Sequence, residues 1–156
     1  MKKSTFFKSA SLALACAAAT AAFSGCGSKN YAENNTAFFI GASGPLTGSA
    51  ASYGIAVQRG AELAVEEINA KNEDGMRFTF EIKDDKASAA DVPTNFAALY
   101  EKGMQLSLGA VTSGACLPFK GLAAEKNLFT LCPSATADDV TKDADTVFQM
   151  CFSDSN

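Results

Sequence analysis

Two short stretches of this sequence place small hydroxyl residues directly after an apolar run. Thr112, Ser113 and Gly114 lie in GAVTSGACLP, and Ser134 and Thr136 lie in LCPSATADD. The N-terminus of a helix presents unpaired N–H groups and a partial positive charge, so hydroxyls there can help to hold a carboxylate-sized anion without Lys or Arg. Ser and Thr also cap helices. The residues alone therefore leave anion binding and helix capping both open.

Covalent catalysis is the other chemistry that these residue types could carry. Ser113, Cys116 and Cys132 are candidate nucleophiles, but the chain contains no histidine to activate them. Lys120 and Lys126 could act as the base, although nothing in their spacing supports that role. The sequence contains neither a phosphate-binding loop nor a GxGxxG motif. We expect no enzymatic activity and no cofactor.

The cysteines do not form a metal-binding pattern. Cys116, Cys132 and Cys151 follow Cys26, and no CxxC pair occurs. Three thiols cannot all pair within one chain. We expect them to behave as small buried apolar residues, and we expect no metal site.

The elements that must position these residues follow from hydrophobic periodicity. Strand patterns and helix patterns alternate along the chain. Such alternation predicts an α/β fold, a parallel Rossmann-like sheet with helices on both faces. The strands are expected at 37–43, 76–83, 104–111, 127–132 and 147–150.

The same periodicity predicts where the strands and helices lie in that fold. The strand at 76–83 alternates strictly and should lie at a sheet edge, whereas the strand at 37–43 is apolar on both faces and should be central. Helices are expected along the stripe from Val57 to Ile68, from about Asp91 because Pro93 suits a first turn, and over about 116–125. Ligands of such sheets bind at the carboxyl ends of the strands. The loops at that edge are 43–53, 84–88, 112–115 and 133–136.

The N-terminal segment predicts export and lipid anchoring. Three lysines precede a charge-free stretch over 9–25, which is typical of a secretory signal, although a buried helix or a membrane span remains an alternative. FSGC, ending at Cys26, resembles the lipobox of bacterial lipoproteins. We expect residues 1–25 to be a lipoprotein signal peptide, Cys26 to be lipidated, and 26–36 to be a flexible tether.

The charge balance excludes one class of partner. Removal of residues 1–25 leaves 10 basic and 17 acidic residues, a net charge of −7. A strongly acidic chain does not bind the phosphate backbone of nucleic acids, so no nucleic-acid partner is expected.

A longer run of the sequence resembles a known family. IGASGPLTGSAASYGIAVQRGAELAVEEINA is similar to the opening of type I periplasmic binding proteins, specifically the branched-chain amino acid receptors of ABC transporters. KDDKA, GAVTSGA and CPSAT resemble later family segments in the same order. The resemblance implies two Rossmann-like lobes that close on an amino acid. Family members are much longer, so residues 37–156 are expected to form a partial N-terminal ligand-binding lobe, here truncated.

The resemblance also implies roles for individual residues. By position, Ser113 matches a serine that binds the ligand carboxylate, and Thr136 matches a threonine that contacts both the carboxylate and the ammonium group. Ser134 matches a residue whose backbone carbonyl receives the ammonium group, and Tyr53 matches an aromatic that lines the side-chain pocket. The acidic pair 84–85 is expected to be structural.

The function implied is that of a solute-binding lipoprotein on the bacterial cell membrane, facing the periplasm or the exterior. It would bind a small amino acid, of branched-chain type, deliver it to an ABC permease, and hold to the membrane through its lipid. A ligand-sensing receptor domain of the same fold is an alternative, and a hydrolytic enzyme is a second.

Overall fold

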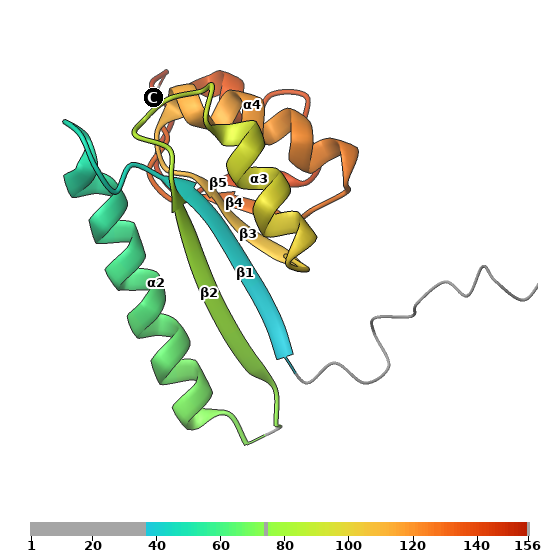
Figure 1. Ribbon diagram of the computed structural model, residues 1–156. Helices are drawn as coiled ribbons and strands as arrows, with labels where there is room; N and C mark the ends of the chain where they lie inside the picture. Colours follow the sequence, from blue (N-terminus) through green and yellow to red (C-terminus); the bar gives the residue numbers. More distant parts are fainter. Residues whose placement is uncertain (1–36, 74, 156) are drawn as a thin grey trace, which may run out of the picture. The chain divides into compact units, whose positions relative to one another are not determined.

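The computed structural model describes residues 37–73 and 75–155. The expected signal peptide, the lipidation site Cys26 and the tether at 26–36 lie outside the described residues. The described part is built on one parallel sheet of five strands in the order β2-β1-β3-β4-β5 (Figure 1). The strands are β1 (Ala37–Gly44), β2 (Arg77–Asp84), β3 (Leu106–Ala110), β4 (Thr130–Cys132) and β5 (Val147–Gln149).

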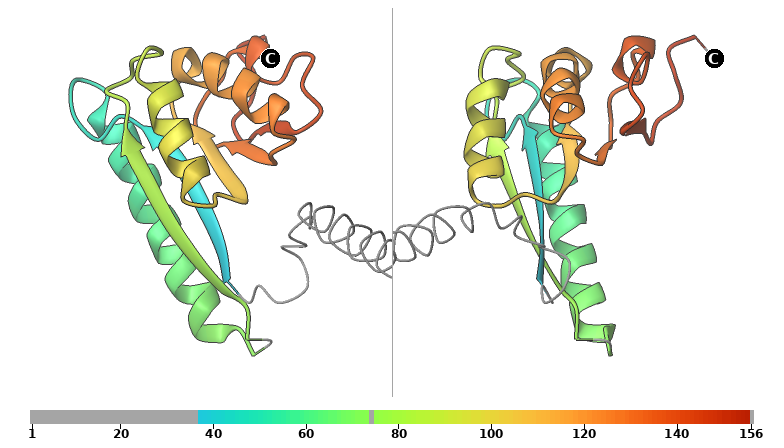
Figure 2. Two further views of the ribbon diagram at one scale, coloured as in Figure 1. Left: turned by 45° about the vertical axis from the view of Figure 1, so that its right-hand side comes forward. Right: turned by 90° about the vertical axis from the view of Figure 1, so that its right-hand side faces the viewer.

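Helices cover both faces of this sheet, as predicted. α2 follows β1 and lies on one face, whereas α3 and α4 lie on the other (Figure 2). The strand order explains this, because a right-handed crossover from β1 to β2 runs in the opposite direction from those that return to β3 and continue to β4. The helices are α2 (Ala51–Lys71), α3 (Val92–Glu101) and α4 (Ser113–Glu125), and a 3₁₀ helix, η1, spans Asp138–Val140.

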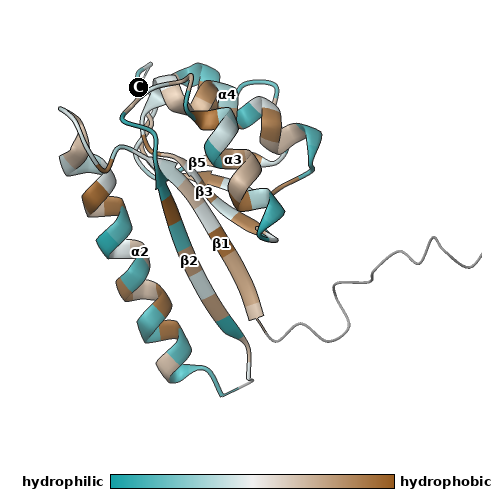
Figure 3. Ribbon diagram, in the orientation of Figure 1, coloured by the Kyte–Doolittle hydropathy of each residue, from teal (hydrophilic) through white to brown (hydrophobic). Residues whose placement is uncertain are grey.

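The strand positions agree with the alternation seen in the sequence. β2 is an edge strand, and its residues alternate between apolar and polar along its length (Figure 3). β1 lies between β2 and β3 and ends in four buried residues. The predictions of an edge strand and a central strand are both confirmed.

The hydrophobic core lies between the sheet and the α3–α4 pair. Phe96 of α3 meets Phe119 of α4 edge to face, with ring centroids 5.0 Å apart. Phe119 and Leu99 are fully buried. Pro93 stands in the first turn of α3, after the N-cap Asp91, as expected.

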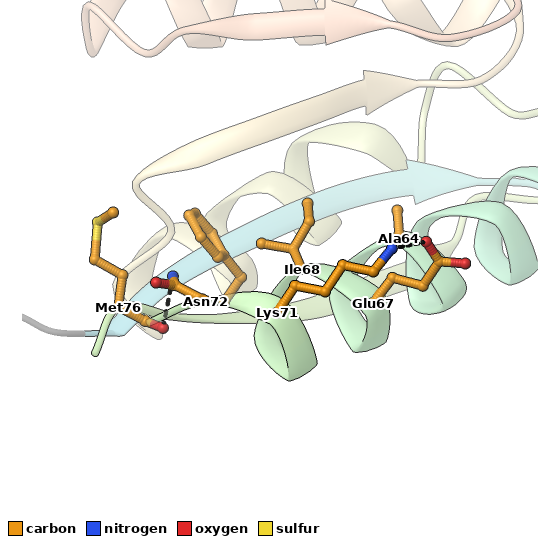
Figure 4. Close-up of a pocket in the computed structure, with 7 residues that line it drawn as sticks. Ala64, Glu67, Ile68, Lys71, Asn72 and Met76 are labelled. Carbon is orange, nitrogen blue, oxygen red and sulfur yellow. Dashed lines mark hydrogen bonds and ion pairs between the residues drawn. The ribbon is translucent and has the colours of Figure 1, made fainter. Parts of the chain in front are cut away.

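The opposite face is more open. α2 packs against β2, and Gly54 is the buried residue of this helix. The apolar stripe that predicted the helix stays partly exposed, with Ile68 at 49%. An open groove lies between the second half of α2 and the start of β2 (Figure 4). Its lining residues are Ala64, Glu67, Ile68, Lys71, Asn72, Met76 and Phe78.

One helix boundary differs from the expectation. α4 begins at Ser113 and not near Cys116, so Pro118 lies inside the helix. Pro118 has no backbone N–H, so it cannot donate the usual helical hydrogen bond to the Gly114 carbonyl. Gly114 is exposed, so water can donate to this carbonyl instead. Within residues 37–73 and 75–155, no helix combines the length and the apolar character that crossing a membrane requires.

The core predicts a large difference between two phenylalanine truncations. Phe119→Ala should lower the free energy of unfolding by about 3–5 kcal/mol, because it leaves a cavity between α3 and α4. Phe152→Ala is the matched control: Phe152 is 76% exposed, and its loss should change stability little. Urea denaturation of the purified protein measures both, and equal effects would contradict the assignment of the core.

Candidate functional site

The loops that carry the predicted site residues leave the carboxyl ends of neighbouring strands. β1 and β3 are adjacent in the sheet, yet the chain leaves them toward opposite edges, which makes their ends a topological switch point. The β3–α4 and β4–η1 loops lie beside each other at this edge, because β3 pairs with β4. Parallel pairing therefore brings together two stretches that lie about twenty residues apart in the sequence.

Ser113 and Thr136 meet at this edge. Ser113 is the first residue of α4, and its Oγ accepts hydrogen bonds from the amides of Thr136, at 3.2 Å, and Ala137, at 3.4 Å. The Ser113 hydroxyl hydrogen has no acceptor among the described residues. The arrangement fixes the oxygen and leaves its O–H free to donate.

The start of α4 keeps further donors free. Its N-cap, Thr112, makes no side-chain capping bond, and the Thr112 hydroxyl is buried without a partner in the described part of the chain. The amides of Ala115 and Cys116 both bond to the Thr112 carbonyl, whereas those of Ser113 and Gly114 in the first turn have no partner among the residues that the structure describes. The Thr112 and Ser113 hydroxyls therefore do not cap α4, which was one of the two interpretations that the sequence left open.

Ser134 contributes a free carbonyl on the neighbouring loop. The carbonyls around it are occupied, whereas the Ser134 carbonyl has no donor among residues 37–73 and 75–155. The donors are Cys151 Sγ for Pro133, Gln149 Nε2 for Ala135, and the amides of Asp154 and Val140 for Thr136 and Ala137. The loop after β4 thus carries a free acceptor, and the start of α4 carries the donor cluster, which consists of the Thr112 and Ser113 hydroxyls and the amides of Ser113 and Gly114.

The residues that fix this loop were not identified from the sequence. Gln149 at the end of β5 donates to Ala135 at 3.0 Å, and the Asp154 amide donates to Thr136 at 2.8 Å. The one available signal was a polar side chain within the short apolar run VFQM.

Tyr53 lies at the same edge but does not bond to the other three predicted residues. It stands in the first turn of α2 and is 61% exposed. In the part of the chain that the structure describes, no hydrogen bond links its side chain to Ser113, Ser134 or Thr136. Its neighbour Gly54 fixes the helix position, because a Cβ there would lie 1.9 Å from the Pro45 carbonyl oxygen.

Asp84 organises the β1–α2 loop. Its carboxylate accepts from the Thr47 hydroxyl at 2.6 Å and from the amides of Leu46, Thr47 and Lys86. Desolvation raises the pKa of Asp84, but the Thr47 hydroxyl and the three amides outweigh it and hold the pKa below its ordinary value.

Asp85, the residue after the end of β2, is fully buried. Its Oδ2 accepts from Ser43 Oγ at 2.9 Å, and its Oδ1 accepts from the Ala87 amide. Burial raises the pKa of Asp85, because desolvation penalises the ionised form more than these bonds favour it. Both aspartates therefore hold the loops of this edge, in keeping with the structural role expected of the pair.

The groups considered for catalysis have other contacts. Lys120 Nζ donates to the carbonyls of Asp139 and Lys142, at 2.6 and 2.7 Å. Lys126 Nζ lies 5.4 Å from the centre of the Tyr100 ring. In the described ranges, no three side chains of metal-binding type gather into a cluster. The arrangement at the strand ends is suited to holding an anion with neutral donors.

Comparison with known proteins identifies a family and several relatives. The family described as periplasmic binding protein matches residues 37–156. A Leu/Ile/Val-binding protein of Rhizobium johnstonii, BraC3, is 36% identical over 104 residues, which cover 66% of this chain and 28% of the relative. A Leu/Ile/Val-binding protein homologue of Brucella melitensis is 32% identical over 145 residues, 92% of this chain and 38% of the relative. The chain thus spans about a third of the length of these relatives.

Solved structures show the same fold. The branched-chain amino acid transporter substrate binding protein LivJ from Streptococcus pneumoniae, in complex with isoleucine, has a TM-score of 0.71 and 36% identity, covering 76% of this chain and 35% of that one. An ABC transporter substrate-binding protein from Desulfitobacterium hafniense, in complex with Leu, has a TM-score of 0.65 and 28% identity, covering 75% and 35%.

The hydrogen bonds of Asp84 predict a pH-dependent effect. Asp84→Asn should lower stability at neutral pH by roughly 1 kcal/mol or less, because bonds to a neutral amide are weaker than bonds to a carboxylate. Because the pKa of Asp84 is lowered in the folded protein, its ionised carboxylate stabilises the fold at pH values above the ordinary pKa of Asp. This contribution is lost as the pH falls through the pKa that Asp84 has in the folded protein. The difference between variant and parent should therefore vanish in acid.

Urea denaturation at a series of pH values measures this effect. Glu66→Gln, a substitution on the exposed surface of α2, is the control and should change stability little at any pH. A difference for Asp84→Asn that persists in acid would show that the carboxylate charge is not what holds the loop.

Proposed function

The chain belongs to the periplasmic binding protein family, and we propose that it forms the carboxylate-binding side of an extracytoplasmic amino acid receptor. Membership of this family indicates an exported protein that works in the periplasm or at the outer face of the membrane. The receptor captures a free amino acid, of branched-chain type, and delivers it to an ABC permease. Ser113 and Thr136 hold the ligand in this proposal, Ser134 accepts from its ammonium group, and Tyr53 borders its side chain.

The unused donors at the start of α4 are the observation that supports this proposal. Three kinds of donor lack an acceptor within the described ranges: the Ser113 O–H, the first amides of α4 and the Thr136 O–H. Thr136 is held beside Ser113, because its amide donates to Ser113 Oγ. A helix N-terminus with free amides favours an anion, and a carboxylate accepts several hydrogen bonds at once. The free Ser134 carbonyl offers an acceptor for an ammonium group close by, so both ends of an amino acid have a partner.

The relatives support the choice of ligand class. Two solved relatives are complexes with isoleucine and Leu, and two sequence relatives are described as Leu/Ile/Val-binding. Ser113, Ser134 and Thr136 are proposed to contact only the groups that all amino acids share, and Tyr53 alone does not define a pocket for one side chain. The branched-chain preference of this chain is thus proposed from the relatives and not from its own pocket.

The two alternatives have less support. A hydrolytic enzyme would need an activated nucleophile, yet Cys116 and Cys132 are buried and the Lys120 ammonium is bonded to two carbonyls. A ligand-sensing receptor domain would use the same amino acid site. The transporter role is favoured over sensing because the relatives are transporter proteins, and a permease gene beside this one would support it further.

Alanine substitutions test the proposed site in the intact protein. Ser113→Ala and Thr136→Ala should each weaken the binding of leucine or isoleucine by roughly 10- to 100-fold, because a hydrogen bond to a charged group contributes ~1.5–3 kcal/mol. Isothermal titration calorimetry measures the affinity, and thermal denaturation confirms that each variant is folded.

Thr79→Ala is the matched control for these substitutions. Thr79 is exposed near the start of β2, away from the strand ends that form the site, so its loss should leave affinity unchanged. Unchanged affinity in both site variants, with folding intact, would assign Ser113 and Thr136 to loop structure alone.

The anchoring proposal concerns Cys26 and has its own test. We expect the mature protein to begin at Cys26 and to carry a lipid on that residue, as the lipobox-like FSGC indicates. Mass spectrometry of the membrane-extracted protein should find no residue of 1–25 and an acylated N-terminal peptide. An unmodified Cys26 would contradict lipid anchoring and leave the ligand proposal intact.

A further inference from the structure

Cys116 and Cys132 form a buried thiol pair in the two segments that carry the proposed ligand-binding residues. Their sulfur atoms lie 3.4 Å apart, and each residue is 1% exposed. Cys116 stands one helical turn after Ser113 in α4, and Cys132 ends β4 two residues before Ser134. The pair thus joins the two segments that carry the donor cluster and the free carbonyl.

The surroundings hold both sulfur atoms in position. The Cys116 thiol donates to the Ala110 carbonyl at 2.9 Å or to the Cys132 sulfur. The Cys132 sulfur packs against the backbone of β3, since a Cβ on Gly109 would lie 2.9 Å from it. The sulfur–sulfur distance would need to shorten by only about 1.4 Å to reach a disulfide bond length near 2.05 Å.

We propose that Cys116 and Cys132 form an intrachain disulfide in the exported protein, and that this cross-link clamps the first turn of α4 to the end of β4. Disulfides form and persist outside the cytoplasm, which is where proteins of this family work. The bond closes a loop of 17 residues that contains most of α4. A disulfide that closes a loop of this size substantially raises the free energy of unfolding, because it restricts the unfolded chain.

The oxidation proceeds by thiol–disulfide exchange with an external disulfide, either a small-molecule disulfide or that of an oxidase. The thiolate of one cysteine attacks the external disulfide and releases one external thiolate. The second cysteine thiolate attacks the mixed disulfide and releases the other. The protein thiols lose two protons and two electrons, and the external disulfide is reduced to two thiols.

The hydrogen bond between the thiols shifts their pKa values in opposite directions. That bond and burial both raise the pKa of Cys116. The same bond, which Cys116 donates, lowers the pKa of Cys132 against the effect of burial. Because both residues are buried in the folded protein, the exchange takes place while the chain folds after export.

Peptide mapping tests this proposal without any substitution. Cleavage after Lys120, Lys126 and Lys142 separates the three thiols: Cys116 falls in peptide 103–120, Cys132 in 127–142, and Cys151 in the peptide that begins at 143. The full-length exported protein is denatured and treated with N-ethylmaleimide, with and without prior reduction, before trypsin digestion. We expect peptides 103–120 and 127–142 to be linked and two hydrogens lighter than their sum, with Cys151 labelled in both samples.

Variants and stability provide an independent measurement. Reduction should lower the melting temperature by roughly 5–10 °C. Cys151→Ala, the matched control, should keep the linked peptides and this shift, whereas Cys116→Ala should leave Cys132 open to labelling. Labelling of both Cys116 and Cys132 in unreduced wild-type protein would overturn the proposal, and so would a link between Cys132 and Cys151. The peptide map needs no variant to fold and no ligand to bind.

Discussion

The buried carboxylate of Asp85 is the constraint on which this edge of the sheet depends. A buried acid must have hydrogen-bond partners, and here Ser43 at the end of β1 and the Ala87 amide provide them. Asn95 of α3 donates to the Ser43 hydroxyl and to the Asp84 carbonyl, so the helix is tied to the same group. The ends of β1, β2 and α3 are therefore held together around one side chain.

The adjacent Asp84 extends this constraint to the surface. The two aspartates share a strand end, yet their pKa values shift in opposite directions because one carboxylate is buried and the other accepts four hydrogen bonds. The bonds to Thr47 and Leu46 fix the β1–α2 loop, and Gly54 lets α2 pack closely on Pro45. Two consecutive acids, neither of them a proposed ligand contact, thus set where the helix bearing Tyr53 begins.

Much of this fold could be predicted from the sequence, because the periodic spacing of apolar residues along each strand and helix indicates which positions are buried. The strict alternation of 76–83 identified an edge strand, and Pro93 located the start of α3. The start of α4 was misplaced, since no local signal showed that Ser113 would be helical. The donor cluster was anticipated from residue types, but its geometry was not. That geometry depends on a bond between Ser113 and the loop 23 residues later, and on Gln149 from β5.

The two sides of the proposed site follow different physical rules. Within the described ranges, the start of α4 leaves donors unpaired, a cost that an anion can offset, whereas every carbonyl of residues 133–137 except that of Ser134 accepts a hydrogen bond. A neutral donor cluster binds a carboxylate without the long-range attraction that Lys or Arg would add. In the proposed site, selectivity for a zwitterion would depend on the spacing between the Ser113 hydroxyl and the Ser134 carbonyl. The hydrogen bond from the Thr136 amide to Ser113 Oγ and the contact between Cys116 and Cys132 hold α4 against the end of β4, and these contacts would set that spacing.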